Sequence, residues 1–303
     1  MAKKKNRRGN SLKNGFSKLA VSLLLVAVSY IFANYIYPHF SGIETISEDG
    51  RMQVHFIDVG QGDATLIVTP NGKHILIDAG PGSGELDLMA YLKRYEVKSI
   101  ELMILSHPHE DHIGGADRVL TSIKTEKVLV SPAPGTTDSF EKVLDAIDAT
   151  GSAIEVAIPG AIYDIDGVVV HILAPAAADE ENLNNDSIIC RVDYGKAKMI
   201  FSGDAEKEAE VALLAAYGTK ELDCDLFKLG HHGSYTSNTA EFLDTMTPKY
   251  AVACCGEGNE YGHPHSEVRK LLSERGIQLW RTDKDGSVVF LCNGLEFEYI
   301  KTE

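Results

Sequence analysis

Short runs of apolar residues, many of them β-branched, follow one another along most of the chain and are separated by glycine, asparagine and aspartate. Runs of this length and composition are typical of strands. An Asn71-Gly72 pair between two runs is a strong hairpin signal. The pattern predicts strands at 53–58, 64–69, 73–78, 102–105, 127–131, 168–173, 187–192, 197–202, 226–229, 250–254, 278–281, 287–291 and 295–300.

Four other segments repeat their apolar residues near the period of an α-helix, at 85–95, 140–150, 206–217 and 266–275. Gly218 follows the third segment in the position of a C-cap, and Ser266 opens the fourth as an N-cap. Many strands with interspersed helices predict an α/β (α+β) fold. We expect two sheets covered by helices and one domain over residues 51–303.

The N-terminus has a different character. Residues 1–18 contain seven Lys or Arg and no acidic residue, and 19–37 are mostly apolar. Because roughly 20 apolar helical residues span a bilayer, and flanking bases stay in the cytoplasm, we expect a basic cytoplasmic leader at 1–18, one transmembrane helix at 19–37 and a linker at 38–50. The domain would then be extracytoplasmic. A cleaved signal peptide, which would make the protein secreted, is the main alternative, and a buried core helix is a third.

The bulk composition limits the partners. Hydrophobic residues make up 44% and charged residues 24%, which excludes a disordered chain, and the formal net charge is −15. Because non-specific binding to duplex DNA depends on Lys and Arg contacts to phosphate, we expect no strong electrostatic binding of duplex DNA. The membrane, through residues 19–37, is the partner we expect. No protein partner can be inferred.

The five cysteines are odd in number and lack CxxC spacing, which excludes a zinc ribbon or a thioredoxin-type motif. We expect buried free thiols, and one disulfide stays open.

The densest chemistry follows the strand predicted at 102–105. His107, His109, Asp111 and His112 lie within six residues, directly after that apolar run. Imidazole and carboxylate are ligands that suit zinc, manganese or iron, and a strand that ends in a ligand-rich loop is a rigid way to present them. The spacing predicts a metal site.

Two other predicted strands end in candidate ligands. Asp204 follows the strand at 197–202, and His231 and His232 follow the strand at 226–229. First-shell ligands must come from different directions, so we expect these strand ends to converge on one edge of the fold. Asp204 has two carboxylate oxygens and could bridge two cations.

In order and spacing, His107-x-His109-x-Asp111-His112, Gly203-Asp204 and the late histidine pair resemble the metallo-β-lactamase superfamily. The resemblance implies a four-layer αββα sandwich with metals at one edge of the sheets. It also implies that Asp78 supports the histidine loop and binds no metal.

Further motifs are similar to the extracytoplasmic domain of ComEC-type competence proteins, which are DNA-uptake channels. This narrower resemblance covers about residues 52–292. It is carried by Phe56-Ile-Asp-Val-Gly-Gln-Gly-Asp63, Asn184-Asn-Asp-Ser187, Gly230-His-His-Gly-Ser234, Tyr261-Gly-His-Pro264 and Arg281-Thr-Asp283.

Two features depart from these families. The chain has one apolar run, so it cannot itself form a channel with many spans. Where the superfamily usually supplies a third histidine for its first metal, this chain has Asn184-Asn185-Asp186-Ser187, and we interpret the isolated His171 as structural. An amide oxygen is a poorer ligand than imidazole, so the first site could be weak or prefer manganese.

The resemblance implies two divalent ions, with zinc favoured and manganese as the alternative. His107 and His109 would hold one ion, and Asp111 and His112 the other. Asp204 would bridge them. His231 is our choice for the last ligand, and His232 could replace it.

The catalytic candidates are Asp111, His263, Asn185 and Arg281. His263 could protonate a leaving oxygen or hold a phosphate, Asn185 could orient the phosphate or the ligands, and Arg281 could contact the phosphate. For Asp63, contact with metal or substrate competes with a simpler role in a turn.

The implied activity is metal-assisted hydrolysis, in which cations lower the pKa of bound water and supply hydroxide as the nucleophile. We expect a membrane-anchored extracytoplasmic phosphodiesterase or nuclease, with single-stranded DNA among its candidate substrates. The alternatives are hydrolysis of another bond, such as a β-lactam or lactone, and a non-enzymatic partner in DNA uptake or the envelope.

Overall fold

The computed structural model describes residues 50–301, except 134 and 177–181. The predicted leader (1–18), the apolar segment (19–37) and all but the last residue of the linker (38–50) lie outside this part, and these boundaries stay predictions. Among the described residues, no helix has both the length and the hydropathy needed to span a bilayer. The described residues within 50–93 and 97–301 form one compact unit, to which every candidate site residue belongs.

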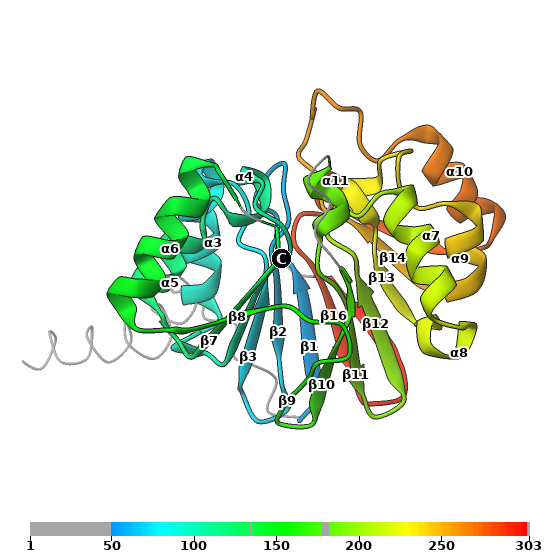
Figure 1. The fold of residues 1–303 in the computed structure, drawn as a ribbon. Helices are drawn as coiled ribbons and strands as arrows, with labels where there is room; N and C mark the ends of the chain where they lie inside the picture. Colours follow the sequence, from blue (N-terminus) through cyan, green and yellow to red (C-terminus); the bar gives the residue numbers. More distant parts are fainter. Residues whose placement is uncertain (1–49, 134, 177–181, 302–303) are drawn as a thin grey trace, which may run out of the picture. The chain divides into compact units, whose positions relative to one another are not determined.

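Two large sheets make up the centre of this unit (Figure 1). The first has eight strands in the order β17-β16-β1-β2-β3-β5-β7-β8. It is antiparallel from β17 to β3 and parallel from β3 to β8. Its strands are β1 (Met52–Phe56), β2 (Thr65–Val68), β3 (His74–Ile77), β5 (Leu102–Leu105), β7 (Lys127–Val130), β8 (Ala153–Val156), β16 (Val288–Cys292) and β17 (Phe297–Ile300).

The second sheet has seven strands in the order β15-β14-β13-β12-β11-β10-β9. Its strands β12 to β15 are parallel, and β9 to β12 are antiparallel. They are β9 (Ile162–Ile165), β10 (Val168–Ala174), β11 (Ile189–Tyr194), β12 (Ala197–Phe201), β13 (Leu226–Lys228), β14 (Tyr250–Ala253) and β15 (Gln278–Arg281). A small separate pair is formed by β4 (Ser99–Ile100) and β6 (Lys124–Thr125).

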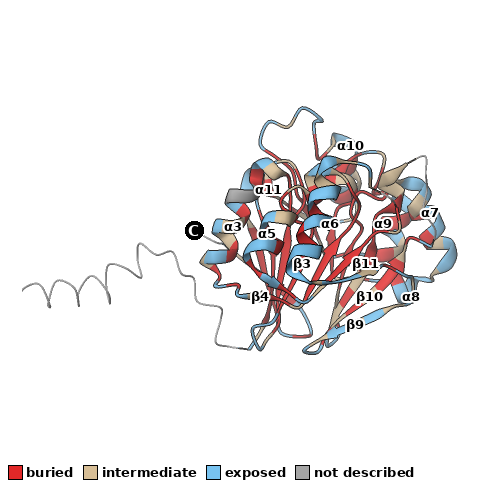
Figure 2. Ribbon diagram, turned by 60° about the vertical axis from the view of Figure 1, so that its left-hand side comes forward, coloured by how far each residue is buried: buried red, intermediate tan, exposed pale blue. Residues whose placement is uncertain are grey.

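Helices cover the outer face of each sheet. Figure 1 shows α3, α5 and α6 beside the first sheet and α7 to α10 beside the second, and in Figure 2 the outward sides of the helices are exposed while the strands are mostly buried. The helices are α3 (Glu85–Arg94), α4 (Glu110–Ile113), α5 (Ala116–Ser122), α6 (Asp138–Thr150), α7 (Lys207–Ala216), α8 (Thr219–Leu222), α9 (Ala240–Met246), α10 (Ser266–Glu274) and α11 (Thr282–Asp285).

The alternation of side chains along each strand fills two cores. Phe56 of β1 stacks on Phe201 of β12 between the sheets, with ring centroids 6.0 Å apart. On β13, Leu226 faces this inner core, while Phe227 points to the other side and meets Phe242 of α9. Since both faces of the inner strands are buried, their sequence reads as a continuous apolar run. The layers confirm the predicted mixed α/β class.

Candidate metal centre

The candidate ligands follow strands whose carboxyl ends meet at one edge of the two sheets. In the first sheet, parallel strands β3 and β5 lead to Asp78 and His107. In the second sheet, parallel strands β12 and β13 lead to Asp204 and the histidine pair after Gly230. Carboxyl ends of parallel strands lie side by side, so segments far apart in the sequence share one site.

The histidine loop after β5 turns at once into α4. His107 Nε2 lies 3.0 Å from Nδ1 of His109 and 4.0 Å from Oδ2 of Asp204. The rings of His107 and His112 have centroids 4.2 Å apart. Asp111 and His112 belong to the single turn of α4, which directs both side chains to the same edge. The four loop residues therefore lie together with Asp204.

Hydrogen bonds fix the orientation of His112. Its Nδ1 lies 2.9 Å from Oδ2 of Asp78, and Asp78 in turn accepts hydrogen bonds from the backbone N–H and the hydroxyl of Ser106. Its Nε2 is left facing Oδ1 of Asp204 at 3.1 Å. Burial lowers the pKa of His112, but Asp204 and Asp78 outweigh burial and hold this pKa well above 6.5. Asp78 contacts the ring on the side away from Asp204, as a supporting residue would.

The histidine pair after β13 lies in a tight turn in which both residues have positive φ, 47° for His231 and 54° for His232. Asn238 holds the turn, since its side chain accepts from the N–H of Gly230 and donates to the carbonyl of Gly230. Positive φ in non-glycine residues is costly and clusters at functional sites.

The two histidines of this turn present different environments. His232 is buried, with Nδ1 bonded to the carbonyl of Cys254 at 2.8 Å and Nε2 lying 3.1 Å from Asp111 and 3.5 Å from Asp204. His231 has 24% of its side chain exposed, with Nε2 3.6 Å from Asp204 and Nδ1 3.2 Å from Glu206. His232 therefore faces both acids of the site, and His231 faces Asp204 from the solvent side.

The donor atoms fit a divalent cation. Nitrogen or carboxylate atoms of Asp63, His112, Asp204 and His232 all lie within 4.8 Å of one another. The buried atoms His112 Nε2 and Asp204 Oδ1 face each other at 3.1 Å, and neither makes a hydrogen bond with any described residue. A nitrogen and an oxygen that converge in this way beside further carboxylates meet the requirement of a metal site.

The acids of the site stay ionised despite their burial. Burial raises the pKa of Asp204, but the charges of His112 and His232 more than offset it, so that this pKa lies well below its usual range. In Asp111 the hydrogen bond from His232 lowers the pKa in the same way, against burial. Ionised carboxylates are the form that binds cations.

A cavity of about 180 Å³ opens onto these groups. The metal-site residues that line it belong to the histidine loop, the Asp204 turn and the histidine pair. They are joined by side chains from other loops. The lining residues are Gln61, His109, Asp111, Asn184, Asp204, His231, His232, Tyr261 and His263.

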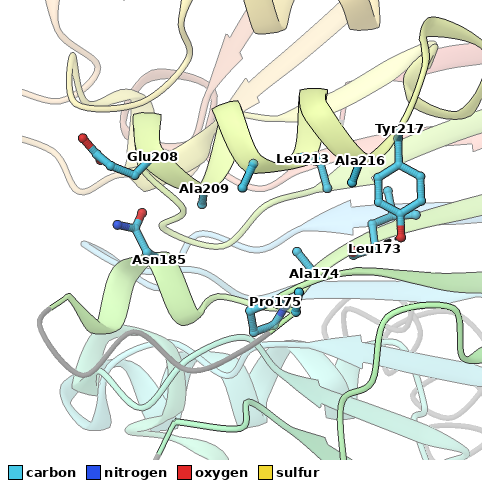
Figure 3. A pocket seen from close by; sticks show the side chains of 11 residues that line it. Leu173, Ala174, Pro175, Asn185, Glu208, Ala209, Leu213, Ala216 and Tyr217 are labelled. Carbon is cyan, nitrogen blue, oxygen red and sulfur yellow. Dashed lines mark hydrogen bonds between the residues drawn. The ribbon is translucent and has the colours of Figure 1, made fainter.

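The structure separates the two asparagines that precede Ser187. Asn184 lines the cavity, and its buried Oδ1 has no hydrogen-bond partner among the described residues. Asn185, our sequence candidate, instead accepts from the N–H of Glu206 and lines a second, apolar cavity beneath α7 (Figure 3). Ser187 accepts from the N–H of Asp204 and so fixes that turn.

The other two catalytic candidates lie in different places. His263 lines the cavity, its ring centroid 5.6 Å from that of His231, and Asn259 anchors its backbone on both sides. Burial and the charge of His232 lower the pKa of His263 to about 4. Arg281 ends β15 with its guanidinium on Asp283, and it is not among the residues that line the cavity.

Asp63 is the site residue that the sequence indicated least. It follows β1 in the glycine-rich loop and is buried, and its backbone N–H donates to the carbonyl of Asp111. Its side chain lies against Lys228 and the histidine rings. The sequence showed it beside a Gly-Gln-Gly turn, a position that many turn-forming aspartates share, and at the end of the Phe56–Asp63 motif.

The sequence is similar to known proteins over most of its length. The sequence profile of the Metallo-beta-lactamase superfamily matches residues 57–257. The chain is 32% identical over 282 residues to ComE operon protein 3 of Bacillus subtilis, covering 88% of this chain and 35% of that protein. It is 30% identical over 234 residues to Competence protein ComA of Neisseria gonorrhoeae, covering 77% of this chain and 31% of that protein. The chain thus spans about a third of the length of these relatives.

Among solved structures, the metallo-beta-lactamase fold protein YhfI from Bacillus subtilis superposes with a TM-score of 0.52 at 12% identity, over 76% of this chain and 95% of that one. At this identity the likeness concerns the fold alone.

Proposed function

Because this chain belongs to the metallo-beta-lactamase superfamily of metal-dependent hydrolases, we propose that it hydrolyses phosphodiester bonds with divalent cations held at the edge of its two sheets. One observation carries the proposal. His112 and His232 come from different sheets, each is held through Nδ1, and each turns Nε2 toward Asp204. Such an arrangement is prepared for cations rather than for packing.

Two ions fit the donor set best. His107 and His109 would hold one, and Asp111 and His232 the other, with Asp204 between them. His112, whose Nε2 faces Asp204, completes the set of proposed ligands. In place of the superfamily's third histidine, Asn184 offers an oxygen. Since oxygen ligands suit harder cations, manganese is as good a candidate as zinc for the first site.

Such ions lower the pKa of a coordinated water and neutralise charge on phosphate oxygens. The chain's own residues supply the rest. Asp204 and Asp111 stay ionised, His231 faces the cavity from its solvent side, and His263 lies across from it. With a pKa near 4, His263 is neutral at neutral pH, so it serves better as a hydrogen-bond donor to a phosphate oxygen than as a proton store.

Phosphodiesters are favoured over other bonds because one relative is named a competence protein, and the ComEC-type competence proteins that the sequence motifs resemble are DNA-uptake channels. We further propose that residues 19–37 anchor the domain at the extracytoplasmic face of the membrane. The net charge of −15 favours a small phosphodiester or a single strand over a duplex.

The test is a substrate panel. The full-length chain, purified in detergent and loaded with Mn²⁺ or Zn²⁺, is assayed on bis-p-nitrophenyl phosphate, single-stranded DNA and nitrocefin. We expect phosphodiester turnover, and a loss of at least about 100-fold in kcat for His232→Ala, because a ligand contributes more than an outer-sphere partner. His171→Ala is the matched control, since His171 pairs with Asp193 on the second sheet, outside the site.

Each outcome separates one hypothesis. Cleavage of nitrocefin alone would indicate a β-lactam or lactone hydrolase on the same fold. If the metal-loaded chain cleaves none of the three substrates, the result would indicate a non-enzymatic partner in DNA uptake or the envelope.

A further inference from the structure

A buried ion pair lies directly beneath the candidate metal centre. Lys228 is the last residue of β13, 2% exposed, and its ammonium contacts Oδ2 of Asp63, which is 4% exposed. Burying a lone ammonium or a lone carboxylate is costly, so each requires the other. No step of the proposed hydrolysis uses either group, and replacing a buried ion pair by hydrophobic residues is often neutral or stabilising. The pair therefore needs another explanation.

Asp63 approaches the two histidine rings at their Nδ1 atoms. Its Oδ1 is 3.2 Å from Nδ1 of His232, and its Oδ2 is 3.8 Å from Nδ1 of His112. The Nε2 atoms of the same rings face Asp204, at 3.5 and 3.1 Å. Asp63 therefore contacts each ring at the nitrogen that does not face Asp204, although one of its carboxylate oxygens belongs to the same close cluster of donor atoms.

Lys228 makes a second contact that reaches the other side of the centre. Its ammonium donates to the carbonyl of Gly203 at 3.1 Å. Gly203 has φ of 51°, and a Cβ there would lie 2.8 Å from the hydroxyl of Ser187. The turn that presents Asp204 is therefore tightly packed and has a cation tied to its carbonyl. One ammonium thus links the Asp204 turn to the carboxylate that contacts both histidines.

We propose that Lys228 and Asp63 are a positioning pair. The buried ammonium and its carboxylate counter-ion hold Asp204, His112 and His232 in the positions needed to bind a metal ion. The inference rests on the proposed metal centre. Asp63 in this view is no metal ligand, and Lys228 compensates its charge so that the site's acids remain available to the incoming cation.

The experiment measures cobalt(II) binding to the full-length chain in detergent. We compare K228M, K228R, D63N and the double variant D63N/K228M by competition with a chromogenic chelator, metal content per chain and the visible spectrum of bound cobalt. K228M and D63N each leave one buried charge alone, so we expect 10- to 100-fold weaker binding with unchanged metal content. K228R should recover part of the loss, and D63N/K228M should bind more tightly than K228M because both charges are removed together.

K198M is the matched control, because Lys198 is a β12 lysine paired with Asp223 outside the site. The inference is overturned if D63N loses one ion per chain while K228M keeps it, since Asp63 would then be a ligand. It is also overturned if K228M and D63N bind cobalt as K198M does. If K228M does not fold, D63N and the double variant decide between the same two outcomes. Should the unmodified chain bind no cobalt, the proposed function itself fails, and the positioning role fails with it.

Discussion

At the scale of single residues, the candidate centre depends on which nitrogen of each imidazole is occupied by protein. Nδ1 of His112 is hydrogen-bonded to Asp78, and Nδ1 of His232 to the carbonyl of Cys254. The Nε2 atom of each ring therefore faces Asp204. The His-x-His-x-Asp-His motif could be predicted from the sequence because all its members lie in one loop. The support of the loop by Asp78 was implied only by the family resemblance. The orientation of the His232 ring could not be predicted, because Cys254 is remote in sequence.

His55 illustrates a histidine with a different role. It is buried on β1 and hydrogen-bonded to Tyr91 and Gln53, and burial, with a smaller effect of His74, lowers its pKa to about 3. The unfolded chain binds the proton near pH 6.5 and the folded chain near 3, so stability is full above pH 6.5 and falls as the pH drops toward 3. We expect His55 to account for about 2 kcal/mol of lost unfolding free energy between about pH 7 and pH 5.

Urea unfolding at about pH 7 and pH 5 measures this, with His55→Gln as the comparison. The variant keeps a polar side chain without a titrating ring, so its loss between the two pH values should be about 2 kcal/mol smaller than that of the unmodified chain. An equal loss in both proteins would show that His55 does not set this pH dependence.

At the scale of elements, the loop between β1 and β2 requires a glycine at one position. Gly62 has φ of 148°, and a Cβ there would lie 2.3 Å from the carbonyl oxygen of Asp111. That close approach lets the N–H of Asp63 bond the same carbonyl. We expect Gly62→Ala to lower the unfolding free energy by about 3 kcal/mol, from backbone strain and overpacking together, and to weaken metal binding.

Gly72 provides the control. It also has positive φ, 78°, but a Cβ added there would meet no atom within 4 Å. Gly72→Ala should therefore cost only about 1 kcal/mol of backbone strain and leave metal affinity unchanged. Equal losses of stability and metal affinity in the two variants would contradict the packing argument. Urea unfolding and chelator competition measure both quantities.

How well each element could be predicted depends on its burial. The strands with two buried faces, such as β5 and β13, matched their predicted segments because apolar runs there are continuous. The edge strands β8 and β9 were missed, since their side chains are largely exposed and carry no clear pattern. The short helix α9 was missed too. Its apolar residues are buried against the second sheet, and so it depends on tertiary packing rather than on helical propensity.

The site shows the same division. Asp204 and the histidine pair were expected to converge because metal ligands must come from different directions. The pairing of β12 with β13, which brings them together in the structure, could not be read from the sequence. The sequence context alone favoured His231 over His232 as the last metal ligand. In the structure, the turn with two positive φ values directs His232 toward Asp111 and Asp204. Asp63 gave a weak signal because its charge partner, Lys228, lies far away in sequence, at the end of a strand in the other sheet.

At the scale of the whole molecule, charge and shape limit the substrate. A net charge of −15 gives no general attraction for phosphate, so outside the proposed metal centre the affinity for a single strand would have to come from the bases. Tyr261 lines the cavity, is 66% exposed and stacks on His263 with ring centroids 5.5 Å apart. Tyr235, 67% exposed, lies against His265 nearby. Exposed aromatic rings beside the proposed hydrolytic centre are suited to stacking bases.

We therefore expect Tyr261→Ala to raise the KM for a single-stranded oligonucleotide by roughly 5- to 150-fold, the effect of one lost base stack, with little change in kcat. Tyr261→Phe keeps the ring and should behave like the unmodified chain. An abasic oligonucleotide should be indifferent to both substitutions, because it has no base to stack. Steady-state kinetics on the two oligonucleotides measure the effect. If Tyr261→Ala weakened cleavage of both equally, the tyrosine would support the loop around His263 rather than bind a base, and the bases would contribute no affinity at this position.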